Sequence, residues 1–298
     1  IMDLDTFKNK FLNKIEFDCE LAKFTWFGVG GKAEILFIVE DLISLSGFLK
    51  NKPNEIDILI IGAGSNLLIR DKGFKGIVLL TKKLNKINID KNHIITAEAG
   101  ATDADVARFA RNNLRGGLEF LLGIPGTIGG GVKMNSGAFG SEFKDVLIDV
   151  KAINHLGQFK TFTNKELGMR YRGLEISEEW IFCSARLKSF KDEKINIENK
   201  MKKVISLRKE AQPTGVKTGG STFKNPIGNK AWKLIDKAGC RGFKVGGAMI
   251  SEKHCNFIIN SKKSTAQDIE DLGEHVKDTV QKVCGIELSW EIKRIGTK

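Results

Sequence analysis

The sequence predicts an α+β protein built from two or three structural units. Short β-rich runs alternate with a helical segment near the start, a hairpin pattern follows in the middle, and helices dominate the last third. With 298 residues, 41% of them hydrophobic, the chain is long enough for more than one domain and can bury a sizeable core.

The first part of the chain combines helices with short strands. Apolar residues at helical spacing predict a helix over residues 4–15. Runs bounded by Gly, Asp and Glu predict strands over residues 35–39, 56–61 and 77–80. A helix over residues 42–50 fits between the first two strands, which is typical of an α/β unit.

The pattern changes in the middle of the chain. We expect a strand over residues 87–97 and then a helix over residues 103–114, capped by Thr102 or Asp103. A Gly-rich segment occupies residues 116–140.

A β-hairpin is expected next. Residues 148–154 and 158–162 have strand character and flank the turn His155-Leu156-Gly157. Alternating apolar positions then predict a half-buried strand over residues 181–187.

A third region begins near residue 195. Helices are predicted over residues 197–208, before Gln212-Pro213, and over residues 231–238. A strand is predicted over residues 256–260.

The chain is expected to close with a helix and a strand. Ser264 and Gln267 form a predicted capping box for an amphipathic helix over residues 269–283, which Gly285 stops. A strand over residues 286–295 follows.

Composition excludes several classes of protein. The five cysteines and four histidines are scattered without metal-ligand spacing, so we expect neither a disulfide framework nor a metal site. No apolar run is long enough for a membrane helix, and the opening residues lack the basic-then-apolar order of a secretion signal. We therefore expect a cytoplasmic protein that does not associate with a membrane.

The net charge of +12 leaves a nucleic-acid-binding protein open as an alternative. The basic residues are mostly Lys spread along the whole chain, however, and only one Tyr is available for base stacking. This pattern favours a solvated surface whose positive field attracts small anions.

Three segments have the composition of ligand-binding loops. In the first, a buried strand runs into Gly62-Ala63-Gly64-Ser65-Asn66, where small residues allow backbone N–H groups to converge on an anion. The segment is not a Walker loop, because no Gly-Lys-Ser/Thr follows it. It is not a dinucleotide fingerprint either, because Leu67 occupies the place of the third Gly. A plain turn between strands is the alternative.

The second segment, residues 123–138, mixes many Gly with Ile, Val, Met and Pro. Gly at this density costs backbone entropy and is kept where the backbone approaches a ligand closely. A flexible linker would be polar, so we expect an ordered loop against a large flat ligand.

The third segment, Gly219-Gly220-Ser221-Thr222-Phe223, exposes a Ser on a Gly-Gly turn. It lacks the GxSxG pattern of an α/β-hydrolase elbow and has no obvious base beside it. A hydrolase nucleophile and a plain turn are the competing interpretations.

Together with further motifs, these segments resemble the UDP-N-acetylenolpyruvoylglucosamine reductase (UDP-N-acetylmuramate dehydrogenase) family of peptidoglycan precursor synthesis. The resemblance covers the chain from about Phe24 to Gly296. The additional motifs lie at residues 25–33, 117–120, 171–172, 220–226, 231–236 and 251–257.

The resemblance implies a two-part FAD-binding domain, like that of vanillyl-alcohol oxidases, and a smaller α+β substrate-binding domain. The implied boundaries are residues 1–80 and 81–194 for the FAD-binding parts and 195–298 for the substrate domain, with the closing strand a candidate to return to the first part. Non-covalent FAD would be held by Gly62, Ala63, Gly64, Ser65, Asn66, Gly123, Ile124, Pro125, Gly126, Thr127, Gly129 and Gly130.

The family reaction is the NADPH-dependent reduction of UDP-N-acetylglucosamine enolpyruvate to UDP-N-acetylmuramate. Hydride passes from reduced flavin N5 to C3 of the enol ether, and C2 is protonated. By the resemblance, Arg172 lies beside the substrate carboxylate, Glu291 stabilises the enolic intermediate, and Ser221 donates the proton to C2. A Glu in that role needs a raised pKa.

The chain also departs from the commoner family pattern. Tyr171 is the only Tyr, so no Tyr-bearing loop can close over the uridine diphosphate, and the chain resembles the shorter second type. Candidates for substrate contacts are Asn225, Lys224, Arg241, Lys244 and His254. We expect a monomer. An oxidase with the same flavin fold is a further alternative.

Overall fold

The computed structural model describes residues 3–298. Ile1 and Met2, part of the opening stretch examined for a leader, lie outside the described residues. The chain divides into two compact units that interleave along the sequence. Unit 1 consists of Ile1–Glu16, Ile35–Ala63 and Gly76–Arg208, and unit 2 of Phe17–Glu34, Gly64–Lys75 and Lys209–Lys298. The division into flavin and substrate domains is functional and stays a prediction.

The larger sheet of unit 1 is antiparallel and has the strand order β12-β11-β13-β7-β6. Its strands are β6 (Ile87–Ile89), β7 (Ile95–Glu98), β11 (Leu147–Ile153), β12 (Phe159–Thr163) and β13 (Ile181–Leu187). The predicted hairpin over residues 148–162 is confirmed, because β11 pairs antiparallel with β12.

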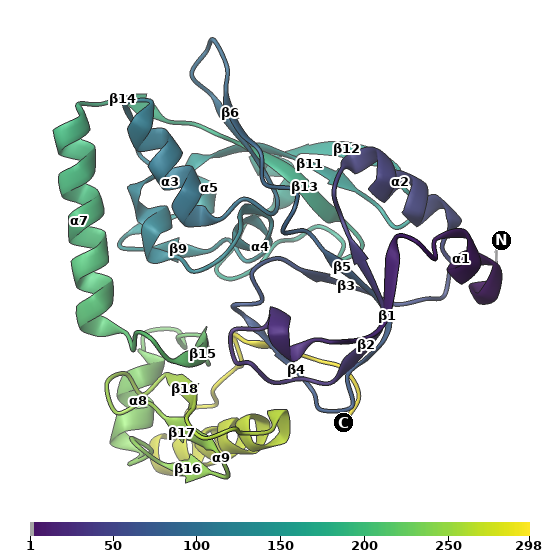
Figure 1. Ribbon diagram of the computed structural model, residues 1–298. Coiled ribbons are helices and arrows are strands. Elements are labelled where there is room, and N and C mark those ends of the chain that lie inside the picture. Colours follow the sequence, from purple (N-terminus) through teal and green to yellow (C-terminus); the bar gives the residue numbers. More distant parts are fainter. Residues whose placement is uncertain (1–2) are drawn as a thin grey trace. The chain divides into compact units, whose positions relative to one another are not determined.

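Helices pack with this sheet around the main core of unit 1. The longest is α7 (Lys194–Ala211), at the left edge of Figure 1. The others are α3 (Asp103–Asn112), α4 (Ile128–Lys133), α5 (Phe143–Val146) and α6 (Asn164–Leu167), with the 3-10 helix η2 (Glu119–Gly123). Two short pairs complete this part: β8 (Arg115–Gly116) with β14 (Phe190–Lys191), and β9 (Gly137–Ala138) with β10 (Ser141–Glu142).

A second sheet has the order β1-β2-β5-β3, and the division between the units falls within its strands β1, β2 and β5. The strands are β1 (Ile15–Glu20), β2 (Lys32–Ile38), β3 (Ile58–Ile61) and β5 (Phe74–Leu80). The helices α1 (Leu4–Lys10) and α2 (Leu42–Asn51) contribute Phe7 and Phe48 to a second core, where Phe48 stacks on Phe37 with ring centroids 4.0 Å apart.

Unit 2 contains a four-stranded sheet of order β15-β18-β17-β16, on which the long helix α9 packs (Figure 1). Its elements are β4 (Leu67–Ile69), β15 (Lys217–Ser221), β16 (Lys244–Val245), β17 (Ala248–Ile250), β18 (Phe257–Asn260), β19 (Lys293–Ile295), α8 (Ala231–Lys237), α9 (Ala266–Cys284) and the 3-10 helix η1 (Ala22–Phe24). The chain end returns to an early segment, because β19 pairs in parallel with β4.

The α+β class is confirmed, and four of the predicted elements need correction. The first helix ends at Lys10, and Ile15 begins β1 instead. The expected strand over residues 87–97 is a hairpin, β6 and β7, whose connection projects from the sheet in Figure 1. Its turn forms because the Asp90 carboxylate accepts the N–H groups of Asn92 and Ile94 at 2.8 and 2.9 Å.

The other two corrections concern the end of the chain. Thr265 and Asp268, not Ser264 and Gln267, form the capping box of α9, since the Ser264 N–H donates to the Asn260 side chain at 3.0 Å. The closing strand is only Lys293–Ile295. For the helix over residues 103–114, the structure selects Thr102 as the cap, because its hydroxyl accepts the Asp105 N–H at 3.1 Å.

Candidate functional site

The turn after β3 has the properties of an anion-binding nest. Among residues 3–298, no backbone N–H from Gly62 to Asn66 donates to a carbonyl. Gly62 cannot carry a side chain, because a Cβ would lie 2.3 Å from the Thr127 hydroxyl oxygen. Gly64 has φ +65°, and a Cβ there would meet the Phe24 carbonyl oxygen at 1.9 Å. The turn therefore presents several unpaired backbone donors, which suit a phosphate or pyrophosphate.

The Gly-rich segment is ordered, as predicted, but it is not a single loop, because Ile128–Lys133 form α4 and Gly137–Ala138 form β9. Backbone hydrogen bonds hold it in place. The N–H groups of Ile128 and Gly129 donate to Ala101 and Ala99, each at 2.9 Å, and the Asp103 N–H donates to Gly126 at 3.2 Å. These bonds attach the loop to the segment between β7 and α3.

The structure changes the explanation for some of these glycines. A Cβ at Gly129 would lie 2.9 Å from the Ala99 side chain, and one at Gly123 would lie 2.5 Å from the Phe139 ring. Both glycines are therefore needed first for packing within the protein. Gly130 differs, since its nearest neighbour would be the Thr127 hydroxyl oxygen at 3.7 Å.

Ser221 lies at the end of β15, where the strand departs from regular pairing with β18. The register shifts between Thr218 and Ser221, and Gly220 adopts φ +80° within this irregularity. Gly219 must lack a side chain because a Cβ would lie 2.4 Å from the Phe27 ring. Irregularities of this kind re-aim side chains next to functional sites.

Glu291 is joined to the Ser221 segment through one carbonyl. The Thr222 oxygen accepts the Glu291 N–H at 2.8 Å, and the Asn66 side-chain amide donates to the Glu291 carbonyl at 3.2 Å. Unit 2 thus brings together three segments that are far apart in the sequence: Asn66 at the end of the nest turn, the predicted proton donor and the predicted acidic residue.

Arg172 lies in unit 1, in a turn with unusual backbone geometry. Its φ is +55°, a region that non-Gly residues occupy at a cost and that recurs at functional sites. The guanidinium lies 5.0 Å from the centroid of the Tyr171 ring, and Nη1 donates to the Asn135 carbonyl at 3.5 Å.

Asn135 holds this turn through hydrogen bonds. It is fully buried, and its side-chain amide donates to the Arg170 carbonyl at 3.2 Å and to the Glu142 carboxylate at 2.9 Å. Its side-chain oxygen accepts the Lys144 N–H at 2.9 Å.

The substrate-binding candidates all lie in unit 2 and differ in what they contact. The Asn225 side chain accepts the Ala231 N–H at 3.0 Å at the start of α8. The Arg241 guanidinium pairs with Asp236 at 2.8 Å and also donates to the Glu252 carbonyl. Arg241 is therefore committed to protein partners.

His254 and Lys224 make contacts of a different kind. The His254 ring packs edge-on against Phe257, and burial lowers the pKa of the imidazole. The Lys224 backbone N–H donates to the Ser289 carbonyl at 2.9 Å, and the residue is half-buried.

Two buried asparagines, Asn135 and Asn256, support the predicted site residues but were not predicted from the sequence. Asn256 is 4% exposed and hydrogen-bonds the backbone of Phe223. Both occur inside segments that carry the family resemblance, and for Asn256 its place between Cys255 and Phe257 is the signal that could have marked it.

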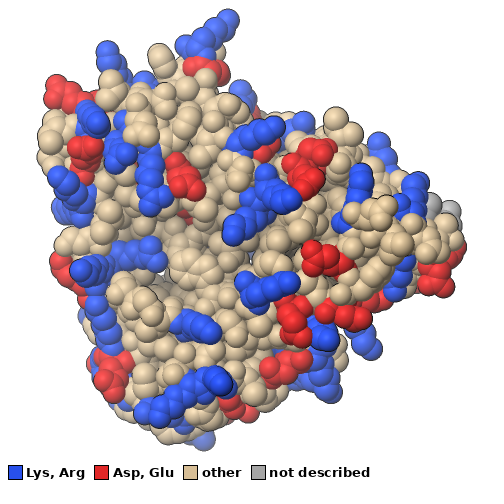
Figure 2. Space-filling view, in the orientation of Figure 1, with Lys and Arg blue, Asp and Glu red and all other residues tan. Residues whose placement is uncertain are grey.

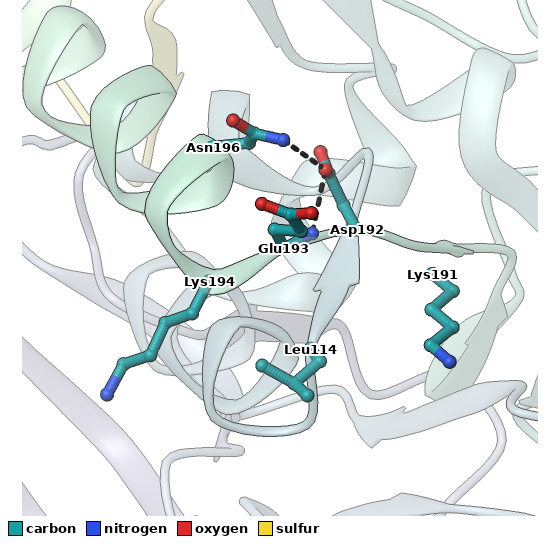
Figure 3. A pocket seen from close by; sticks show the side chains of 6 residues that line it. All are labelled: Leu114, Lys191, Asp192, Glu193, Lys194 and Asn196. Atoms are coloured by element: carbon teal, nitrogen blue, oxygen red, sulfur yellow. Dashed lines mark hydrogen bonds between the residues drawn. The ribbon is translucent and has the colours of Figure 1, made fainter.

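A separate hollow lies at the start of α7 (Figure 3). Leu114, Lys191, Asp192, Glu193, Lys194 and Asn196 line it. The Asp192 carboxylate is already engaged by the Asn196 amide and the Lys200 ammonium, each at 2.9 Å. None of the predicted site residues lines this hollow.

Three further features bear on the kind of protein. Residues 3–298 contain no group of three or more His, Cys, Asp or Glu that could hold a metal ion. No helix in the same range is long and apolar enough to span a membrane. On the face shown in Figure 2, Lys and Arg are spread among Asp and Glu rather than gathered in one patch.

The match of this fold to a family of FAD-binding domains identifies the chain as a flavoprotein. Residues 39–163 match the family described as FAD binding domain. A solved structure of berberine bridge enzyme shares the fold alone, with a TM-score of 0.50 and 14% identity over 64% of this chain and 43% of that one.

The particular family follows from the remaining comparisons. Residues 212–295 match the C-terminal domain of UDP-N-acetylenolpyruvoylglucosamine reductase. Proteins of that name from Rickettsia typhi and Paramagnetospirillum magneticum are each 48% identical, over 94% and 96% of this chain and 95% and 93% of theirs. The crystal structure of the Thermus caldophilus enzyme superposes with a TM-score of 0.81 at 34% identity, over 94% of this chain and 98% of that one. The chain belongs to the UDP-N-acetylenolpyruvoylglucosamine reductase family, whose members are FAD-dependent oxidoreductases.

Proposed function

We propose that this enzyme reduces UDP-N-acetylglucosamine enolpyruvate to UDP-N-acetylmuramate, with NADPH as the electron donor. Family membership supports the substrate, and the observation that carries the chemistry is the convergence in unit 2. Ser221 and Glu291 are joined through the Thr222 carbonyl, and Asn66 of the nest binds the Glu291 backbone. Both co-substrates are nucleotides of the cytoplasm, so we place the reaction there, as a step in peptidoglycan precursor synthesis.

The residues present fit FAD. The unpaired backbone donors from Gly62 to Asn66 suit the pyrophosphate, and the ordered loop from Gly123 to Gly130 is the proposed support for the flavin. When bound, FAD accepts hydride from NADPH and delivers it to C3 of the enol ether.

Arg172 is proposed to bind the substrate carboxylate. Hydride addition to C3 makes that carboxylate group take up negative charge as an enolate, which a guanidinium stabilises through two parallel N–H donors. The strained backbone of Arg172 is consistent with a residue held for function rather than for stability.

Ser221 is proposed to give the proton to C2, and Glu291 to stabilise the enolic form. A hydroxyl is a weak acid, so it serves as a donor only against a strongly basic carbon such as C2 of the enolate. The spacing of the two residues is set by the Glu291 N–H to Thr222 hydrogen bond of 2.8 Å.

The diphosphate contacts are proposed to come from Lys224, Asn225 and His254, since the chain lacks a second Tyr. Arg241 is a weaker candidate because it is paired with Asp236 and Glu252. Lys244, which is exposed on β16, completes the set.

Rapid mixing without oxygen tests the proposal. The purified protein should be yellow, NADPH should bleach it, and the enolpyruvyl sugar nucleotide should restore the colour with formation of the lactyl ether. An oxidase with this fold would instead be bleached by an alcohol or sugar and restored by oxygen. A colourless protein that binds DNA with a steep salt dependence would contradict the proposal entirely.

A further inference from the structure

We propose that Asn256 is a positioning residue for proton delivery, which acts by fixing the backbone that carries Ser221. This inference rests on the proposed function, because it needs Ser221 to be the proton donor. It concerns a residue that touches Ser221 only through the two residues after it.

The Asn256 side chain hydrogen-bonds both backbone polar groups of one residue, Phe223. Its oxygen accepts the Phe223 N–H at 3.0 Å, and its amide donates to the Phe223 carbonyl at 2.8 Å. In addition, the Asn256 carbonyl accepts the Thr222 N–H at 2.8 Å. Both residues that follow Ser221 are thus bound to Asn256.

Regular pairing between β15 and β18 does not extend to residues 222 and 223. The ladder between β15 and β18 is irregular across Gly219 and Gly220, and it ends where Ser221 pairs with Phe257. Beyond that point the side chain of Asn256 replaces a strand partner, because a primary amide carries a donor and an acceptor in the arrangement of a peptide group. Phe223 is 1% exposed, so its polar backbone groups would otherwise be buried without partners.

The segment that Asn256 holds is also hydrogen-bonded to Glu291. The Thr222 carbonyl accepts the Glu291 N–H, and Phe223 bridges Trp290. A shift of residues 222 and 223 therefore moves the Ser221 hydroxyl and the Glu291 segment together. Misplacement by about 1 Å costs on the order of 10²-fold in an enzyme step.

Asn260 provides a matched control, because it ends β18, the strand that begins directly after Asn256. Its amide donates to the Phe27 carbonyl at 2.9 Å and its oxygen accepts the Ser264 N–H at 3.0 Å, so it also ties two backbone segments together. Neither of these contacts involves residues 221–223.

The test compares Asn256→Asp, Asn256→Ala, Asn260→Asp and Ser221→Ala as FAD-loaded enzymes. Flavin content, thermal stability and both half-reactions are measured. Asn256→Asp keeps the acceptor for Phe223 N–H but faces the Phe223 carbonyl with a carboxylate. We expect flavin reduction by NADPH at the wild-type rate, and reoxidation by the enolpyruvyl substrate slowed by roughly 10–10². Asn260→Asp should reoxidise at close to the wild-type rate.

The pH profile supplies a readout that a loss of stability would not produce. The carboxyl that Asn256→Asp introduces again offers one donor and one acceptor once it is protonated, so reoxidation of this variant should recover as the pH falls. The titratable side chains beside this contact are those of His254 and Cys255 before Asn256, Lys224 after Phe223, and Glu291, which is bonded to Thr222. All four are present in the wild type and in Asn260→Asp. Those two proteins should therefore show no such recovery.

The outcomes separate this inference from the proposed function. Normal reoxidation by both Asn256 variants, with Ser221→Ala slow, would overturn the positioning role and leave the function standing. If the Asn256 variants slow both half-reactions equally and lose flavin, then Asn256 has only a structural role. Normal reoxidation by Ser221→Ala would remove the proton donor on which the inference rests. If Asn256→Ala does not fold, Asn256→Asp still decides.

Discussion

The two units support their predicted catalytic side chains in opposite ways. In unit 1, Arg172 lies in a turn that is hydrogen-bonded to Asn135, and the two residues have positive φ, +55° and +40°. In unit 2, Ser221 ends a strand, and hydrogen bonds to Asn256 and Glu291 hold the residue that follows it. A guanidinium reaches far from its backbone, whereas a Ser hydroxyl is one carbon away. The short side chain therefore depends more on its backbone support.

The largest expected effect is at Ser221 itself. Ser221→Ala removes the proton donor, and reoxidation by the enolpyruvyl substrate should fall by roughly 10²–10⁴. Flavin content and reduction by NADPH should be nearly unchanged. Ser221→Cys should recover part of the loss because a thiol of similar size can also donate a proton. Turnover close to wild type in Ser221→Ala would sink the assignment.

Next in size is the loss of the guanidinium fork. Arg172→Lys keeps the positive charge but loses the paired donors, so reoxidation should slow by about 10². Asn135→Ala tests whether the two units differ in how much their catalytic side chains depend on backbone support. Because the long Arg172 side chain can adjust to a small shift of its backbone, Asn135→Ala should slow reoxidation less than Asn256→Ala does. The reverse ranking would contradict the difference drawn between the units.

A backbone change should sharpen the comparison further. Gly220 has φ +80°, and the nearest atom to a Cβ there would be the Ser65 carbonyl oxygen at 4.0 Å, so Gly220→Ala brings strain of about 1 kcal/mol without a clash. Reoxidation should slow by several-fold to about tenfold as Ser221 shifts. Gly215→Ala is the control, since Gly215 has φ +71°, is exposed and has nothing within 4 Å of a Cβ. Equal effects in the two variants would mean that strain alone, not the position of Ser221, is responsible.

In unit 1, Gly130 tests the flavin loop separately from packing. A Cβ there meets no protein atom closer than 3.7 Å, whereas one at Gly129 would lie 2.9 Å from Ala99. Gly130→Val should therefore lower FAD retention while the protein unfolds at nearly the same temperature. Gly129→Val should lower both. Full FAD content in Gly130→Val would show that no ligand contacts this side of the loop.

The smallest effect concerns stability. Asp103 is fully buried beside the flavin loop, neither carboxylate oxygen has a partner among the described residues, and burial raises the pKa of this carboxyl. Its folded state keeps a proton that the unfolded state releases above about pH 4, so this group costs stability as the pH rises. Asp103→Leu should stabilise the fold by about 1–3 kcal/mol at pH 7. Denaturant unfolding should show the gain shrinking toward pH 4; a gain independent of pH would contradict this account.

Patterns that depend on neighbours in the sequence predicted most of the fold. The helices α2 and α9 follow from apolar spacing and from Gly285 at a left-handed stop, and the β11–β12 hairpin follows from its turn. The β6–β7 turn was missed because it uses Asp90 side-chain bonds and a positive φ at His93 rather than Gly or Pro.

Contacts between distant residues explain what the sequence could not predict. The closing strand is short because residues 289–291 bond to residues 222–224 instead of forming a longer ladder. The hydrogen bonds between Asn256 and Phe223 join residues that are 33 positions apart in the sequence, so no local pattern predicts them. The motifs could name Ser221 and Glu291, but only the fold shows that one carbonyl joins them.

The most direct test of the account is to measure both half-reactions side by side, without oxygen, in the wild type, Arg172→Lys and Ser221→Ala. We predict that NADPH reduces the flavin at the same rate in all three, and that only reoxidation by the enolpyruvyl sugar nucleotide slows in the two variants. If either variant loses as much rate in flavin reduction as in reoxidation, then its side chain does not serve the substrate step, and the central claim is wrong.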